Sequence, residues 1–333
     1  MKSIRSIVLK DFVYPEQVKS LIPPEEFVLF DIETTGLSHS HNHVILIGYI
    51  VFDGQDFILH QLFCENRNEE RKILVEFQKV LEEKAYYISY NGRAFDIPFL
   101  NSRYKIHDIP CELKKYRNLD IMRLVKLNRD YFNLPDFKLK TVEKFLGIER
   151  QDTISGKESV ELYDLYEKIQ THELEEKILL HNYEDILYLL KCLDIVKFAQ
   201  LDSLYAESPV KIQFADISAF LMEIKTKGDQ LTLVLQSENF SDREYYDYAS
   251  VVTWAYNSSK NELTLTCPIF TLIIEGHSYQ FADVDLMAYY DSQFNQMSYE
   301  DKMSHLITEA GVKKHYNIYR LISECFKHFH TNF

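Results

Sequence analysis

Apolar runs separated by turn residues dominate the first hundred positions of the chain. Runs at 27–30, 44–52 and 57–63 consist of strand-forming residues joined by short turns, so they predict three strands of an antiparallel meander. From Glu69 to Glu83 the apolar residues fall on one helical stripe, and a further strand-like run follows at 85–90. A strand, a helix and a strand after a meander predict an α/β fold in which helices flank a mixed sheet.

The segments before and after this region have different patterns. Residues 1–26 carry only short apolar pieces and are interpreted as a lead-in to the sheet. Helical spacing predicts later helices over the segments 120–127, 138–145, 158–170 and 172–198. Near residue 200 the pattern changes to short strand-like runs, such as 262–266 and 271–274, and the chain closes with a helical stripe. Because 333 residues exceed the ~100 to 200 of one domain, we predict two: residues 1–200, and a β-rich (α+β) domain over 201–333.

The charge of the chain is unevenly distributed. The formal net charge is -14, which argues against nucleic acid as a partner, because Lys and Arg supply most of the affinity for phosphates. Residues 101–150, however, hold twelve Lys and Arg against seven Asp and Glu. Two interpretations are open for six of these basic residues: they contact the phosphate backbone of a bound strand, or they form a solvated helix face. The six are Lys114, Lys115, Arg117, Arg123, Lys126 and Arg129.

Cysteine usage and hydropathy restrict where the protein is expected to work. The five cysteines are scattered and odd in number, which favours reduced thiols in a cytoplasmic protein over a disulfide framework or a zinc site. No stretch approaches the ~18 consecutive apolar residues of a membrane span, so no membrane partner is expected.

Two carboxylates stand where the first predicted strand ends. Side chains alternate along a strand, so Asp31 and Glu33 leave the same face while Ile32 enters the core on the opposite face. Neighbouring carboxylates repel each other unless a cation or a shared proton holds them together. This stretch alone leaves a metal site and an exposed strand end equally open. The nearby polar run 39–43, with three alternating histidines, is interpreted as an exposed loop.

Two further stretches carry candidate catalytic groups. Asn91 and Gly92 form a turn after the strand at 85–90, and Pro98 is tolerated in the first turn of a helix, which places Asp96 near a helix N-terminus. Aspartate is also a good N-cap, which would be a sufficient structural reason for its presence. In the helical pattern at 172–198, His181 and Asp185 are four residues apart and share one face.

These stretches, D-I-E-T-T-G-L, N-G-x-x-F-D-x-P-F-L and H-N-Y-E-D, resemble in this order the three motifs of the DEDD superfamily of 3'-5' exonucleases. The spacing is most similar to the YprB-type ribonuclease H-like branch, over residues 25–197, and residues 137–148 resemble the segment before the last motif. The resemblance implies a ribonuclease H-like fold for the first domain. Residues 201–333 lie outside it.

The resemblance assigns the catalytic carboxylates to Asp31, Glu33, Asp96 and Asp185. They would bind two divalent ions, Mg²⁺ or Mn²⁺, about 3.5 to 4 Å apart. Asp31 would bridge both ions, Glu33 and Asp185 would hold the ion that activates water, and Asp96 would support the other.

His181 departs from the family pattern. In the subclass that uses histidine, this residue lies five positions before the last aspartate, which is Leu180 here; His181 lies four before Asp185. Two interpretations are open. His181 acts as a catalytic base or orienter of the attacking water, or it is a solvent-facing helix residue.

The motifs also carry candidate substrate contacts, namely Thr34, Leu37, Asn91 and Phe95. The resemblance implies that Asn91 and Phe95 position the terminal nucleotide and that Leu37 wedges against a base, although packing explains Leu37 and Phe95 equally well. We therefore expect a metal-dependent 3'-5' exonuclease that hydrolyses DNA or RNA with a free 3' end, with single strands favoured. The alternative is a non-catalytic nucleic-acid- or protein-binding module that retains the fold.

Overall fold

The computed structural model describes residues 1–9, 12–150, 154, 156–214, 217–238, 245–247, 251–290, 298 and 305–327. The chain divides into two compact units, Met1–Pro209 and Val210–Phe333. The division lies later than position 200 because helix α9 (Leu201–Glu207) packs against helix α4 (Ile121–Leu127) within the first unit. Within the described part of the chain, none of the helices combines the length and the apolar content that a membrane span requires.

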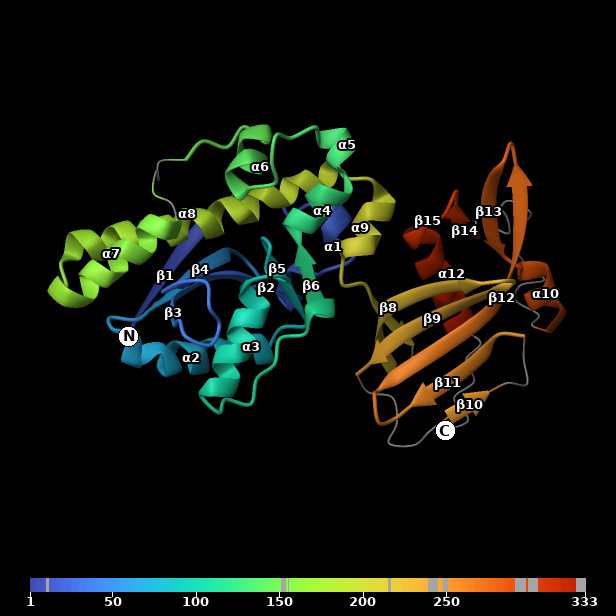
Figure 1. Cartoon of the computed structure of the whole chain (residues 1–333), viewed down its shortest axis with the longest axis horizontal. Coiled ribbons are helices and arrows are strands. Elements are labelled where there is room, and N and C mark those ends of the chain that lie inside the picture. Colours follow the sequence, from blue (N-terminus) through green and yellow to red (C-terminus); the bar gives the residue numbers. More distant parts are fainter. Residues whose placement is uncertain are drawn as a thin grey trace. The chain divides into compact units, whose positions relative to one another are not determined.

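The first unit is built on a mixed sheet whose strands lie in the order β1-β4-β3-β2-β5-β6 (Figure 1). The strands are β1 Lys2–Leu9, β2 Phe27–Thr34, β3 Val44–Phe52, β4 Phe57–Phe63, β5 Tyr86–Ser89 and β6 Asn118–Asp120. The predicted antiparallel meander is confirmed by β2, β3 and β4, and β5 and β6 run parallel to β2. The interpretation of residues 1–26 as a lead-in is wrong in part, because β1 adds an edge strand beside β4.

Helices cover both faces of this sheet (Figure 1). The helices and 3-10 turns of this unit are α1 Glu16–Lys19, η1 Pro24–Glu26, η2 Arg67–Glu69, α2 Glu70–Glu82, α3 Asp96–Ile106, η3 Lys115–Arg117, α4, α5 Arg129–Phe132, α6 Leu139–Phe145, α7 Gly156–Ile169, α8 His172–Cys192, η4 Leu193–Lys197 and α9. Helices α2 and α3 bury their apolar residues against Phe30 and Ile32 of β2. On the opposite face, α7 and α8 pack against Leu46 and Phe63. The predicted helix over 172–198 is thus α8 continued by a short 3-10 turn.

Gly48 allows α8 to approach the sheet directly opposite the carboxylate strand. Gly48 pairs with Asp31 across β2 and β3. A Cβ atom on Gly48 would lie 2.2 Å from Oδ1 of Asn182 and 2.8 Å from a side-chain carbon of Ile186, which is closer than atoms can pack. Only glycine fits there, so the helix turn that carries His181 lies against the strand next to Asp31.

The second unit is an antiparallel sheet with helices. Its strands are β7 Lys211–Phe214, β8 Ile217–Lys227, β9 Gln230–Ser237, β10 Tyr245–Asp247, β11 Thr253–Asn257, β12 Glu262–Ile274, β13 His277–Ala282, β14 Leu306–Glu309 and β15 Val312–Lys313, and its helices are α10 Val284–Tyr290 and α12 His315–Lys327. Trp254 of β11 meets Phe326 of α12 edge to face at 5.0 Å. The predicted strands 262–266 and 271–274 form one strand, because β12 changes its pairing partner at Pro268 from β9 to β13 without ending.

Candidate active site

A cavity of about 930 Å³ opens at the end of β2. Its walls come from β2 and the turn after it, the start of α3, the segment from α6 to α7, and α8. All nine residues predicted for the site line this cavity: Asp31, Glu33, Thr34, Leu37, Asn91, Phe95, Asp96, His181 and Asp185. Residues that are up to 154 positions apart in the sequence, from Asp31 to Asp185, therefore share one concave surface.

The carboxylates of β2 are crowded: Glu33 is buried and Asp31 is partly buried. Glu33 is only 8 % exposed, while Ile32 between the two carboxylates is buried in the core on the opposite face. Burial raises the pKa of Asp31 well above its usual range, and the charges of Asp96, Glu33 and Asp185 raise it further. Burial also raises the pKa of Glu33 to about 7, although His181 beside it acts in the opposite direction. Such a group of carboxylates favours a bound cation or bound protons.

Asp96 is the first residue of α3 and is 3 % exposed. Its Oδ1 accepts a hydrogen bond of 3.2 Å from the backbone N–H of Ile32, which ties the helix to the carboxylate strand. Asp96 is not the N-cap, because Phe95 occupies that position and makes no side-chain cap. Burial raises the pKa of Asp96 to about 7, against the opposing hydrogen bonds from the backbone N–H groups of Asp96 and Ile32.

His181 faces these carboxylates from α8. The interpretation as a solvent-facing helix residue is wrong, because His181 is only 4 % exposed. Its Nε2 lies 3.8 Å from Oε1 of Glu33 and 3.7 Å from Oδ2 of Asp185. These three side chains each offer a ligand atom, and the three atoms lie within 4.8 Å of one another. Carboxylate oxygens and an imidazole nitrogen suit Mn²⁺, and the carboxylates suit Mg²⁺, so this donor set fits a divalent cation.

Sequence reasoning missed Arg150, which also lines the cavity. Its guanidinium donates hydrogen bonds to both oxygens of Glu143 and a further one to Oδ1 of Asp185. Burial opposes the charge of Arg150, but the hydrogen bonds to these two carboxylates outweigh it and raise its pKa. The only signal in the sequence was its place just after the segment 137–148, which resembles a family segment.

The candidate substrate contacts line the cavity in or next to turns of the backbone. Leu37 is 81 % exposed and follows Gly36, whose φ of 152° lies in the region that favours glycine. Thr34 donates its hydroxyl to the carbonyl of Gly36, so it shapes this turn. Asn91 has a φ of 64°, and its N–H donates to the buried carboxylate of Asp120 at 2.9 Å.

The basic wall of the cavity differs from the one that the sequence suggested. None of the six basic residues between 114 and 129 lines the cavity, and Arg123 is bound to the buried carboxylate of Glu207. Lys138, Lys140 and Lys157 line it instead. They lie beside the carboxylates and can meet the phosphates of a bound strand.

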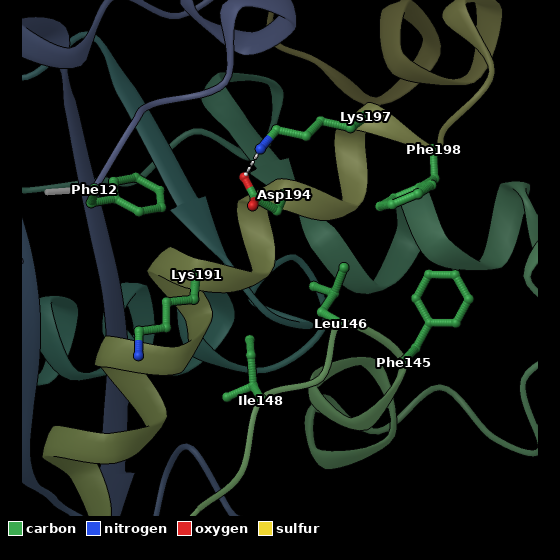
Figure 2. Close-up of a pocket in the computed structure, with 8 residues that line it drawn as sticks. All are labelled: Phe12, Phe145, Leu146, Ile148, Lys191, Asp194, Lys197 and Phe198. Atoms are coloured by element: carbon green, nitrogen blue, oxygen red, sulfur yellow. Dashed lines mark ion pairs between the residues drawn. The ribbon is translucent and has the colours of Figure 1, made fainter.

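A second, smaller cavity of about 470 Å³ lies beside the C-terminal part of α8 (Figure 2). Its lining is mainly apolar and aromatic, and Asp194 is paired with Lys197 at 2.7 Å. It holds a single carboxylate and is therefore no match for the chemistry of the first cavity.

Comparison with solved structures shows only distant likeness. The family B DNA polymerase from the archaeon Pyrobaculum calidifontis has a TM-score of 0.42 and 16% identity over 64% of this chain and 34% of its own. Exonuclease I from E. coli, in complex with a dT13 oligonucleotide, has a TM-score of 0.31 and 13% identity over 50% of this chain and 45% of its own. Brucella melitensis NrnC bound to pGG has a TM-score of 0.32 and 18% identity over 53% of this chain and 75% of its own.

The chain spans about a third of the polymerase and less than half of Exonuclease I, and at these TM-scores the likeness says nothing about its activity. A search of curated proteins found no match. Among family descriptions, RNase_H_2 of the RNase_H superfamily matches residues 28–196, which is half of the chain and contains the four carboxylates, His181 and the mixed sheet apart from β1 and the first residue of β2. The chain therefore belongs to the RNase H superfamily.

Proposed function

We propose that this protein is a metal-dependent 3'-5' exonuclease of the DEDD type, in its YprB-like branch, acting on DNA or RNA. Membership of the RNase H superfamily supports a nuclease. The observation that carries the proposal is the convergence of Asp31, Glu33, Asp96 and Asp185 in one cavity. A protein that only bound nucleic acid would gain nothing from gathering four carboxylates where phosphates must approach, since like charges repel.

The proposed residues would hold two divalent ions, Mg²⁺ or Mn²⁺. Bound at this site, such ions supply charge neutralisation for the phosphate and a lower pKa for the attacking water. Glu33 and Asp185 would supply the ligand oxygens beside His181, and Asp31 and Asp96 extend this set along β2 and α3. In the reaction, the water oxygen bonds to phosphorus and releases a proton to His181, while the bond from phosphorus to the 3'-oxygen breaks and that oxygen takes a proton from solvent.

His181 manages the proton of the attacking water in this proposal. Its Nε2 is within 4 Å of both Glu33 and Asp185, and the buried position keeps the ring from turning to solvent. A neutral imidazole at this place can accept the proton of a water that lies between the carboxylates. Lys138, Lys140 and Lys157 would contact the phosphates, while Leu37 and Phe95 contact the terminal bases.

The decisive experiment compares carboxylate variants on a 5'-labelled oligonucleotide with a free 3' end, in Mn²⁺ or Mg²⁺. Asp31→Asn and Asp185→Asn should each lower the rate at least ~100-fold, because each removes a ligand charge on which transition-state stabilisation depends. The control is Asp194→Asn, which removes a partly buried carboxylate of the second cavity, does not touch the first cavity and should retain the parent rate. An oligonucleotide blocked at its 3' end tests the polarity.

Two results would contradict the proposal. If Asp31→Asn degrades the oligonucleotide at the parent rate, the assignment of the active site is wrong. A parent protein that binds oligonucleotide without metal-dependent cleavage would favour the alternative, a binding module that retains the fold.

A further inference from the structure

Arg150 connects two carboxylates at the wall of the cavity. Its Nε and one terminal nitrogen donate to the two oxygens of Glu143, both at 2.5 Å, and the other terminal nitrogen donates to Oδ1 of Asp185. The Arg150 side chain is 8 % exposed and that of Glu143 is 2 % exposed. The guanidinium also lies over the ring of Tyr188, with 5.4 Å from its carbon to the ring centre. Three of its nitrogens and one of its faces therefore contact residues of α6 and α8.

The backbone that leads to Arg150 is also held in place. Helix α6 ends at Phe145 and is followed by Gly147, whose φ of 73° is left-handed, and the N–H of Ile148 donates back to the carbonyl of Glu143 at 2.8 Å. Figure 2 shows Ile148 facing the helix that carries Lys191. Because this segment is fixed on α6 and lies along α8, the guanidinium has little freedom to follow a moving carboxylate.

We propose that Arg150 is a positioning residue, which holds Oδ1 of Asp185 and thereby offers Oδ2 to a divalent cation. Oδ2 is the oxygen that lies 3.7 Å from Nε2 of His181, and it belongs with Glu33 to the ligand oxygens beside His181. A hydrogen bond to one oxygen of a carboxylate fixes the rotation of that carboxylate and restricts it to one ligand atom. The inference rests on the proposed function, because it takes Asp185 as a metal ligand.

Lysine cannot replace Arg150 in this role. The planar guanidinium meets both oxygens of Glu143 with one edge and Asp185 with the remaining nitrogen. An ammonium group is a single point charge, so it would stay with the buried Glu143 or move to Asp185. Arg150→Lys therefore keeps the charge and loosens the orientation of Asp185.

The test is calorimetry of Mn²⁺ binding, with thermal unfolding measured alongside. Arg150→Lys should weaken Mn²⁺ binding by ~10- to 100-fold, as is usual when a group that orients a ligand is lost. The matched control is Arg103→Lys, because Arg103 makes the same two-bond contact with buried Glu70, outside the cavity. Arg103→Lys should lower the unfolding temperature by a similar amount and leave Mn²⁺ affinity unchanged. Cleavage by Arg150→Lys should recover as the Mn²⁺ concentration is raised.

Each outcome has a distinct meaning. If Arg150→Lys binds Mn²⁺ as tightly as the parent, Arg150 is purely structural and the inference is wrong, although the proposed function stands. If its activity stays low at saturating Mn²⁺, the role is not positioning of a ligand. A parent that binds no Mn²⁺ would contradict the proposed function itself. If Arg150→Lys does not fold, Glu143→Gln serves in its place, since it removes the charge that anchors Arg150 and should weaken Mn²⁺ binding in the same direction.

Discussion

At the scale of single residues, burial and the neighbouring negative charges disfavour the ionised forms of the carboxylates in the site. Asp31, Glu33 and Asp96 each have a raised pKa, and the first cause in every case is burial. Arg150 is the cation in direct contact with Asp185, and it also favours the ionised form of Asp31. The remaining negative charge would favour a bound cation, as the proposed two-metal mechanism requires.

This balance predicts how stability depends on pH in the absence of metal. The pKa of Glu33 rises from 4.5 to about 7 on folding, and that of Asp96 rises from 3.8 to about 7. The folded state therefore binds more protons than the unfolded state between these limits, so the free energy of unfolding falls as pH rises from about 4 to 7. We expect a loss larger than the ~1.4 kcal/mol that corresponds to one pKa unit, because both groups are shifted by more than one unit.

The measurement is thermal unfolding with EDTA from about pH 4 to about pH 7. Added Mn²⁺ should restore stability most strongly at the upper end, where the carboxylates are ionised. Glu33→Gln should flatten the pH dependence. An EDTA-treated parent whose stability rises with pH through this window would show that these carboxylates are ionised without a metal.

The sequence predicts the residues of this site better than their contacts. Each carboxylate lies in a short motif that can be recognised locally, and the β alternation of Asp31, Ile32 and Glu33 follows from strand geometry. The burial of His181 does not follow from helical spacing, because spacing gives the shared face and not what covers it. Arg150 has no motif of its own, and its contact with Asp185 exists only after α6 and α8 have packed.

At the scale of elements, the packing of α8 on the sheet decides whether the site forms. Helix α8 carries His181 and Asp185 on the turns beside Asn182, and Asn182 accepts a 3.1 Å hydrogen bond from Gln61 of β4. The absence of a side chain at Gly48 lets this turn reach the strand. A glycine inside a strand is the signal for such a close approach, although it does not say which element approaches.

Gly48→Ala should separate α8 from the sheet. The new methyl group would meet Asn182 and Ile186 at distances that require the helix to move, which costs about 1–3 kcal/mol in a packed core. We expect a lower unfolding temperature and weaker Mn²⁺ binding, because His181 and Asp185 move with the helix. Both are measured by thermal unfolding and calorimetry.

Asn182→Ala provides the control for this prediction. The double variant should be more stable than the sum of the two single effects, because part of the clash is removed. Additive effects would show that Gly48 acts through something other than its contact with α8.

The elements themselves could be predicted where the pattern is local. The meander, α2 and α6 follow from runs and stripes that a short window contains. Strand β1 could not, because Lys2 and Arg5 interrupt its apolar pattern, and charged residues are common on strands at a sheet edge. Strand β6 has only three residues and is defined by pairing with β5. The sequence predicts two strands in place of β12, because Pro268 lies between its apolar runs. In the structure, Pro268 marks the position where β12 changes its pairing strand from β9 to β13.

At the scale of the whole molecule, the candidate site belongs to one unit. The cavity residues, Arg150 and its partner Glu143 all precede position 209, and the RNase H superfamily match ends at 196. Helix α9 belongs to the same unit through Glu207, which binds Arg123 with two hydrogen bonds and is nearly buried. A fragment that ends at 200 would therefore expose α4 and leave Arg123 without this partner.

A fragment of residues 1–209 should fold and cleave, whereas a fragment of residues 1–197 should be less stable. The longer fragment keeps both faces of the sheet covered, and it keeps the ion pair between Arg123 and Glu207. Loss of α9 leaves apolar surface of α4 exposed, and we expect a cost of several kcal/mol at ~25 cal/mol per Å² of exposed apolar area.

Circular dichroism during heating measures the stability of each fragment, and metal-dependent cleavage of a dinucleotide measures its activity. A dinucleotide is the substrate to choose because it is the smallest one with a phosphodiester bond, so its cleavage depends least on contacts outside the site. If the 1–209 fragment folds and binds Mn²⁺ but does not cleave the dinucleotide, residues 210–333 contribute to the chemistry.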